Sequence, residues 1–201
     1  MTIDKRITVA ITGASGSPYA LALLQALVKH KQQIFLLISD AAREVMRLEM
    51  GHALPSSRED SEGFFRQHCQ DNTGAIHLLA NHDWLACPAS GSGAPTRMVI
   101  CPCSMGTLAA IACGLSNNLI ERAADVAIKE QHQLIVLPRE MPLSALHLEN
   151  MLKLARLGVI VMPASPAFYH QPQSVQEIVD FVVDRLLKHL GLQGTLPAWG
   201  V

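Results

Sequence analysis

The chain has 201 residues and a formal net charge of −1, and 49% of its residues are hydrophobic while only 4% are aromatic. This length and aliphatic composition favour one α/β domain, in which helices cover both faces of a sheet. The balanced charge gives no global field for nucleic acid or for an acidic membrane surface, so we expect neither as a partner. No apolar run reaches the roughly 18 residues that cross a bilayer, and we expect no signal peptide.

In the first part of the chain, apolar runs end in small or polar residues. Residues 7–11 form the first predicted strand, which leads into the turn Thr12-Gly13-Ala14-Ser15-Gly16-Ser17-Pro18. A helix follows, with Pro18 in its first turn. Residues 34–38 form a second strand, which ends at Ser39-Asp40. A short helix over 41–46 comes next and carries Glu49 near its end.

The pattern weakens between residues 51 and 95. Here we expect only a helix near 62–69 and a strand near 76–79. The segment ends in a loop over 88–95 that is rich in Pro, Gly and Ser. A long loop inside a domain is usually functional.

The second half of the chain resumes the alternation of strands and helices. Strands are predicted over 98–101, 134–137 and 159–162, and they end at Pro102-Cys103-Ser104, Pro138-Arg139-Glu140 and Pro163-Ala164-Ser165. Helices are predicted over 107–113, 119–129, 144–157 and 174–190. Arg122 and Lys129 share one face of the second of these helices, and Arg185 borders the apolar stripe of the last one.

Five strand ends followed by polar or charged residues predict a mostly parallel sheet. The expected fold is a Rossmann-like three-layer α/β sandwich that forms a single domain over residues 1–201. In a parallel sheet all carboxyl ends lie on one edge, and ligands bind in the crevice outside that edge. We therefore expect one composite site there, and a C-terminal tail over about 191–201 that packs on or near a site.

The turn Gly13-Ala14-Ser15-Gly16 lies between a strand and a helix, where backbone N–H groups can point at an anion. It does not match the G-x-G-x-x-G or P-loop pattern, and Ser17 breaks the G-x-S-x-G pattern of a nucleophile elbow. These differences disfavour a nucleotide hydrolase and an α/β-hydrolase. An anion site is favoured over an ordinary tight turn.

The five cysteines are odd in number and include no C-x-x-C pair. They indicate reduced thiols in a cytoplasmic protein. Cys101 and Cys103 are spaced unlike zinc ligands, which favours a packing role. The nine histidines show no metal-ligand spacing either, so we expect no metal site.

Several motifs follow one another along the chain: Thr12-Gly13-Ala14-Ser15-Gly16, Cys101-Pro102-Cys103-Ser104 with Gly106-Thr107, Asn117-Asn118-Leu119-Ile120-Glu121-Arg122-Ala123-Ala124-Asp125, Pro138-Arg139-Glu140 and Ala167-Phe168-Tyr169. Together with His147-Leu148-Glu149-Asn150-Met151 they resemble the UbiX-type flavin prenyltransferases. The likeness runs from about residue 6 to Trp199. Met105 stands where a small or hydroxylated residue is expected, but backbone amides there can still meet a phosphate.

The resemblance implies an activity and its partners. Family members join a dimethylallyl group from dimethylallyl monophosphate to N5 and C6 of reduced FMN. The product, prenylated FMN, serves a UbiD-type decarboxylase in ubiquinone synthesis or in aromatic-acid breakdown. Family members are also homododecamers whose sites are completed across subunits.

The resemblance also implies the roles of individual residues. FMN would be held by Gly13, Ala14, Ser15, Ser39, Ser104, Met105, Gly106, Thr107 and Arg139. The prenyl phosphate would be bound by Ser90, Gly91, Arg122, Lys129, Tyr169 and Arg185, with Trp84 and Trp199 walling the prenyl pocket. The catalytic residues would be Ser15, Glu49, Lys129 and Glu140, with Glu49 and Glu140 serving proton transfer and positioning.

The charge pattern agrees with two phosphate esters bound by a nearly neutral chain. Four cations fall at predicted site edges: Arg122, Lys129, Arg139 and Arg185. Arginine suits bidentate phosphate recognition. The chain has no D-D-x-x-D cluster to hold magnesium and diphosphate. The sequence therefore predicts a metal-independent reaction.

Two other functions compete with this one. A flavin-dependent cysteine decarboxylase would need a catalytic histidine after an early helix and a Pro-x-Met-Asn segment, and neither is found. A non-catalytic FMN-binding subunit would not need the second cationic cluster of Arg122, Lys129 and Arg185.

Overall fold

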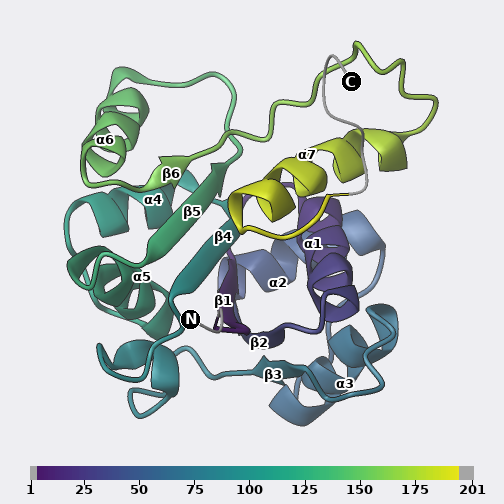
Figure 1. Ribbon diagram of the computed structural model, residues 1–201, viewed down its shortest axis with the longest axis horizontal. Coiled ribbons are helices and arrows are strands. Elements are labelled where there is room, and N and C mark those ends of the chain that lie inside the picture. The colour runs from purple at the N-terminus through teal and green to yellow at the C-terminus, as the bar shows by residue number, and fades with distance from the viewer. Residues whose placement is uncertain (1–3, 195–201) are drawn as a thin grey trace.

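A parallel sheet forms the centre of the molecule in the computed structural model, which describes residues 4–194 (Figure 1). Within these residues its strands are β1 (Arg6–Ile11), β2 (Gln33–Ile38), β3 (Ile76–Leu78), β4 (Arg97–Cys103), β5 (Gln133–Pro138) and β6 (Ile160–Val161). Their order in the sheet is β3-β2-β1-β4-β5-β6, and every adjacent pair is parallel. The sheet grows outward in both directions from β1 and β4. The point between these two strands is the switch point, where such sheets bind ligands.

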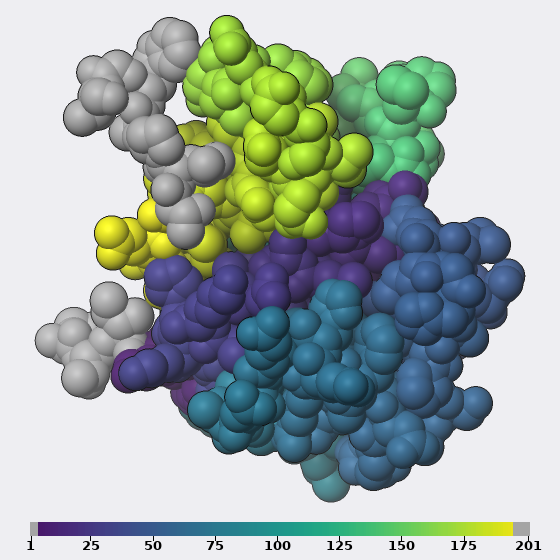
Figure 2. Space-filling view, turned by 90° about the vertical axis from the view of Figure 1, so that its right-hand side faces the viewer, coloured from purple at the N-terminus to yellow at the C-terminus, as the bar shows by residue number. Residues whose placement is uncertain are grey.

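Helices cover both faces of the sheet. One face carries α1 (Ser17–Lys29), α2 (Asp40–Met50), α3 (Arg58–His68) and α7 (Val175–His189). The other face carries α4 (Met105–Ala112), α5 (Leu119–Lys129) and α6 (Ala145–Arg156). The helix α7 packs along α1, and the segment that leads into α7 forms a raised lobe beside α1 (Figure 2). This is the three-layer sandwich that the sequence predicts.

Alternating side chains of the central strand divide the core between the two faces. Ile7, Val9 and Ile11 of β1 pack with α1 and α7, whereas Ala10 packs with α4 on the opposite face. Aliphatic residues make up most of both clusters, and Phe65 is the buried aromatic residue of the first one.

Serine caps place two helix N-termini at the carboxyl edge of the sheet. Ser39 Oγ accepts a hydrogen bond from the Ala42 N–H at 3.1 Å, and Ser104 Oγ accepts one from the Thr107 N–H at 3.3 Å. Both serines directly follow a strand, so each begins a helix where a strand has just ended. The positive ends of α2 and α4 are thereby held at this edge.

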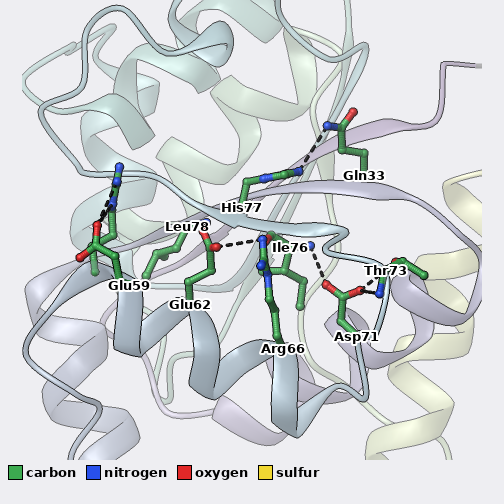
Figure 3. A network of polar contacts seen from close by, with 10 residues as sticks. Gln33, Glu59, Glu62, Arg66, Asp71, Thr73, Ile76, His77 and Leu78 are labelled. Atoms are coloured by element: carbon green, nitrogen blue, oxygen red, sulfur yellow. Dashed lines mark hydrogen bonds and ion pairs between the residues drawn. The ribbon is translucent and has the colours of Figure 1, made fainter.

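The outer side of the edge strand β3 is closed by side chains (Figure 3). Arg66 Nε and Nη2 donate to the Ile76 carbonyl at 3.0 and 2.9 Å, and Glu62 accepts from the Leu78 N–H at 2.8 Å. Glu62 and Arg66 also form an ion pair at 2.9 Å. Asp71 accepts from the Ile76 N–H at 2.9 Å. These side chains take the backbone groups that an open edge would offer to another chain.

The predicted elements agree with the structure apart from a few differences. The sheet is parallel throughout rather than mostly parallel. The helix α3 begins four residues before the predicted one, because Ser57 Oγ accepts from the Asp60 N–H at 3.0 Å and caps it. Most of the tail predicted to pack near a site, from residue 195 on, lies outside the described residues. Within residues 4–194, no helix is both long and apolar enough to span a membrane.

Candidate active site

The loops after β1 and β4 flank the switch point, and Thr12 joins them. The Thr12 N–H and Oγ1 both donate to the Pro102 carbonyl, at 3.2 and 3.0 Å. The Ser104 N–H donates to Thr12 Oγ1 at 2.8 Å. The buried threonine thus fixes the Gly13–Gly16 turn relative to the start of α4.

Small residues in this turn are required by close approach and by backbone conformation. A Cβ on Gly13 would lie 2.5 Å from the Cβ of Ala41, so glycine lets α2 approach the turn. Gly16 has a φ of 135°, which a residue with a side chain rarely adopts. Ala14 is buried, and its N–H donates to the Thr12 carbonyl at 2.8 Å. The amide of Ala14 is therefore not available to a cofactor.

The anion at the start of α1 is a carboxylate of the chain itself. Glu49 Oε1 accepts from the Gly16 N–H at 3.0 Å, and Oε2 accepts from the Ser17 N–H at 2.7 Å. Burial raises the pKa of Glu49, but hydrogen bonds from Ser15, Ser17 and Gly16 outweigh that effect and hold the pKa below its ordinary value of 4.5. Glu49 is thus ionised at neutral pH. The backbone N–H groups at the Gly16 end of the turn are therefore already bound by the chain itself.

Arg139, which follows β5, reaches across to the turn after β1. Its Nε donates to the Ser15 carbonyl at 3.1 Å, and its N–H donates to the Cys103 carbonyl at 3.4 Å. Arg139 therefore touches both loops of the switch point, and its remaining guanidinium N–H groups can meet an anion there. The neighbouring Glu140 is exposed, and its Oε1 accepts from the Met141 N–H at 3.2 Å.

The first turn of α4 leaves backbone groups open at the carboxyl edge of the sheet. The amides of Met105 and Gly106 have no partner inside the helix, and they lie at its positive end. The side chain of Met105 is buried in the core, so only its backbone faces the edge. A Cβ on Gly106 would meet no atom within 4 Å, so packing does not require this helical glycine. At Gly106 the backbone carries no side chain and lies beside free amides. This arrangement fits the phosphate-bearing flavin that the resemblance implies.

A cavity of about 250 Å³ lies beside α4, at the ends of β2 and β3. Two predicted cofactor residues, Ser39 and Thr107, line it. Other lining residues are Asp40, Asn81, His82, Asn117, Asn118, Ile120 and Glu121. Asn81 Nδ2 donates to the Ile38 carbonyl at 2.6 Å, and the Asn81 carbonyl accepts from the Leu119 N–H at 2.7 Å. Asn81 thus ties the end of β2 to the start of α5.

Asn81 and His82 are cavity residues that the sequence analysis did not single out. Asn81 lies shortly after β3, much as Ser39 follows β2, so its position at a strand's carboxyl end is the signal that identifies it. That signal is weak because β3 has only three residues. The Oδ1 atom of Asn81 is buried without a hydrogen-bond partner among the described residues.

Three predicted substrate residues lie at the opposite edge of the sheet, where the strands begin: Ser90, Gly91 and Lys129. Lys129 ends α5, and β5 begins four residues later at Gln133. The loop containing Gly91 lies beside Lys129, because a Cβ on Gly91 would sit 2.9 Å from Lys129 Nζ. Arg6, the first residue of β1, donates to the Gly93 carbonyl of the same loop at 3.1 Å.

Arg122 and Lys129 share a face of α5 but not an edge of the sheet. Arg122 Nε donates to the Ala89 carbonyl at 3.1 Å, and Nη1 forms an ion pair with Asp125 at 2.8 Å. Lys129 Nζ pairs with Glu130. A rise of 1.5 Å per residue separates Arg122 from Lys129 by about 10 Å along the helix. The helix α5 crosses from the carboxyl edge to the opposite edge before β5 begins, so it carries Arg122 and Lys129 toward different edges of the sheet.

The remaining predicted residues lie around α7 and in the segment between β3 and β4. Tyr169 is 56% exposed in the segment between β6 and α7, and Arg185 is exposed on α7. Trp84 is 47% exposed, with the ring of His82 6.2 Å away. Trp199 lies outside the described residues.

The cysteines at the end of β4 have the packing role that the sequence predicts. Cys101 and Cys103 are fully buried, one in each core cluster. Burial raises the pKa of both thiols, that of Cys103 to about 12. All five cysteines are unpaired. Neither buried thiol is poised to react.

Comparisons with known proteins identify relatives that match nearly the whole chain. The family model described as Flavoprotein matches residues 1–187. The flavin prenyltransferase UbiX of Pseudomonas aeruginosa is 54% identical over 201 residues, which cover 100% of this chain and 96% of that protein. The crystal structure of AnUbiX (PadA1) in complex with FMN and dimethylallyl pyrophosphate has a TM-score of 0.83 and 34% identity, covering 98% of this chain and 97% of that one. A dodecameric FMN-dependent UbiX-like decarboxylase from Escherichia coli O157:H7 has a TM-score of 0.81 and 39% identity, covering 96% and 98%.

The fold, the switch-point site and the matched family model define a flavoprotein. Within that class the identities to curated relatives extend over the whole chain. The chain belongs to the UbiX family of flavin prenyltransferases.

Proposed function

We propose that this chain transfers a dimethylallyl group from dimethylallyl monophosphate to N5 and C6 of reduced FMN. The product would be prenylated FMN for a UbiD-type decarboxylase. Family membership supports the reaction class. The observation that carries the site assignment is the contact of Arg139 with Ser15 across the switch point, beside the bare first turn of α4.

The cofactor is assigned to the carboxyl edge. Ser39 and Thr107 share a cavity there, and the free amides at the start of α4 can receive polar or charged cofactor atoms. Arg139 adds positive charge beside them. Reduced FMN supplies the electron-rich N5 and C6 atoms that take up the prenyl group.

Glu49 is assigned to proton transfer. It is ionised at neutral pH, as a base must be, and the Ser15 hydroxyl is hydrogen-bonded to it at the cofactor edge. Its low pKa makes it a weak base, so the departing phosphate shares the role of accepting the proton lost from C6. Glu140 is placed next to Arg139 to help position the reacting groups.

A second copy of the chain is assigned to complete each site. Lys129 and Gly91 lie at the edge opposite Arg139, so one chain cannot place both groups around one ligand. Three leucines of α6 are at least half exposed, which supports contacts between copies: Leu146, Leu148 and Leu152. The E. coli relative is a dodecamer, and we propose the same homododecameric assembly here.

The second copy's cations are assigned to the leaving phosphate. Breaking an allylic C–O bond builds positive charge on carbon and negative charge on the phosphate, and both need stabilisation away from water. Ser90, Arg122 and Lys129, with Tyr169 and Arg185, would hold the phosphate. A desolvated contact between the developing carbocation and the aromatic face of Trp84 or Trp199 would stabilise the transition state by about 2 kcal/mol, or roughly thirtyfold in rate. Most of the acceleration must therefore come from the phosphate clamp and the cofactor.

Two further properties follow from the same assignment. Arg and Lys side chains meet the negative charge of the leaving phosphate. We therefore propose that no metal ion takes part and that chelators leave the rate unchanged. The unpaired cysteines support a reducing compartment, so we place the enzyme in the cytoplasm.

One assay tests the proposed reaction against its alternatives. The purified protein is incubated without oxygen with reduced FMN and dimethylallyl monophosphate, and flavins are analysed by mass spectrometry. A flavin heavier by one C5H8 unit supports the proposal. Bound but unmodified FMN would instead favour a non-catalytic flavin-binding subunit. In a second incubation, with oxidised FMN and a cysteinyl peptide, release of carbon dioxide would favour a cysteine decarboxylase.

A further inference from the structure

Three aromatic rings meet where the segment after β6 packs against α7. The rings of His170 and Phe181 are stacked, with centroids 5.1 Å apart and an interplanar angle of 7°. Tyr169 stands edge-on to both, 5.9 Å from Phe181 at 83° and 5.8 Å from His170 at 77°. Offset stacks and edge-on pairs are the favourable arrangements of aromatic rings. The cluster therefore fixes the orientation of Tyr169, whose ring remains more than half exposed.

The nitrogens of His170 take no part in this arrangement. Both Nδ1 and Nε2 are buried and have no hydrogen-bond partner among the described residues. By contrast, Nδ1 of His147 accepts from the Ser144 N–H at 3.3 Å and helps to cap α6. Among residues 4–194, His170 therefore makes its contacts through the flat of its ring.

Phe181 also connects this cluster to a cation. Arg185 lies four residues after Phe181 on α7 and so on the same face, one turn further along. Helical side chains lean toward the N-terminus of their helix, so Arg185 leans toward the turn that carries Phe181. One turn of α7 therefore sets the positions of both Tyr169 and Arg185.

We propose that His170 is a positioning residue for the prenyl phosphate. Its ring, stacked on Phe181, holds Tyr169 beside Arg185 so that the two act on one anion. This inference rests on the proposed function, which assigns Tyr169 and Arg185 to that phosphate. His170 itself touches neither substrate nor cofactor in this account.

The test compares four variants of the full-length protein: His170→Ala, His170→Phe, Tyr169→Phe and the double variant H170A/Y169F. For H170A we expect the KM for dimethylallyl monophosphate to rise about tenfold, as for the loss of one well-placed hydrogen bond, while the Kd for FMN stays within about twofold. H170F keeps the stack and has no orphaned nitrogens, so its KM should stay within about threefold of wild type. If His170 acts through Tyr169, the double variant should be no worse than Y169F alone.

A matched control removes another His–Phe stack from the same protein. The rings of His77 and Phe35 stack at 5.9 Å on β2 and β3. H77A should change neither the KM nor the FMN Kd. An unchanged KM in H170A, additive losses in the double variant, or an equal KM increase in H77A would each overturn the inference. A wild-type protein that forms no prenylated flavin would overturn the proposed function instead, so the two failures are distinguishable.

Discussion

The carboxylate of Glu49, on α2, accepts a hydrogen bond from the backbone N–H of Ser17 at the start of α1, with 2.7 Å between the two atoms. Thirty-two residues of sequence separate these two groups, and the bond closes α2 over the switch-point turn. Glu49 thus supplies, from within the chain, the negative charge that a bound phosphate could place at the N-terminus of α1.

The Glu49 carboxylate should stabilise the folded protein in a pH-dependent way. Its pKa in the folded state is lowered, so its contribution is fully present above the ordinary value of 4.5 and is lost as the pH falls through the folded-state pKa. Replacing it, in Glu49→Gln, should cost about 1 kcal/mol at pH 7 after allowing for the exposure of this residue. Urea unfolding over a pH series from 7 down to 3 measures the difference, which should shrink as the pH falls below 4.5.

The control for Glu49 is Glu44→Gln on the same helix. Glu44 pairs with Arg47 on the surface of α2, at 2.9 Å. This variant should lose less than about 0.5 kcal/mol across the same pH series. A pH-independent loss in E49Q would show that the carboxylate is not the stabilising group.

Gly106 should matter for FMN and not for folding. Its added Cβ would meet no protein atom, and alanine is the better helix former, so Gly106→Ala should leave the unfolding free energy unchanged or raise it by up to about 1 kcal/mol. FMN affinity should fall at least about tenfold, because the methyl group would occupy the space assigned to the cofactor. Flavin fluorescence titration measures that affinity.

Gly63 of α3 provides the matched control for Gly106. A Cβ there also meets nothing within 4 Å, and the residue is exposed. Gly63→Ala should give a similar gain in stability with an unchanged Kd for FMN. Equal FMN affinity in G106A and wild type would remove the first turn of α4 from the cofactor site.

The pair Glu62 and Arg66 should protect the β3 edge (Figure 3). The double variant E62A/R66A leaves the Ile76 carbonyl and the Leu78 N–H without their partners, so we expect a loss of about 1–3 kcal/mol. The opened edge should also promote self-association, seen as faster aggregation by light scattering at 37 °C.

The exposed Arg58 serves as the control for this edge, since it pairs with Glu59 on the same helix. Arg58→Ala should change the free energy of unfolding by less than about 0.5 kcal/mol and leave the aggregation rate unchanged. If E62A/R66A aggregates no faster than R58A, the two side chains do not guard the edge.

The strands and their parallel arrangement could be predicted from sequence because they depend on local patterns. Apolar runs ending at Ser39, Ser104 and Arg139 mark strand ends, and parallel pairing brings those ends together. The position of Lys129 was not accessible in this way. Helical periodicity tells which face of α5 a residue occupies, but not which edge of the sheet that part of the helix has reached.

Contacts between distant segments could not be predicted from the sequence either. No periodicity predicts that Glu49 would cap α1 or that Asn81 would bind the end of β2, because each contact depends on how a loop folds back. The resemblance named the site residues and implied sites completed across subunits, but it did not say which residue comes from which copy.

In the proposed assembly, the carboxyl edge of one chain, where FMN is assigned, and the cations of another copy form one active site. Mixing inactive Arg139→Ala and Lys129→Ala subunits by co-expression tests it most directly. If the site is shared between copies, random mixing pairs two intact halves in about one site in four, and about a quarter of wild-type prenylated-flavin formation returns. If the mixed oligomers stay as inactive as either variant alone, Arg139 and Lys129 serve the same chain's site and the account is contradicted.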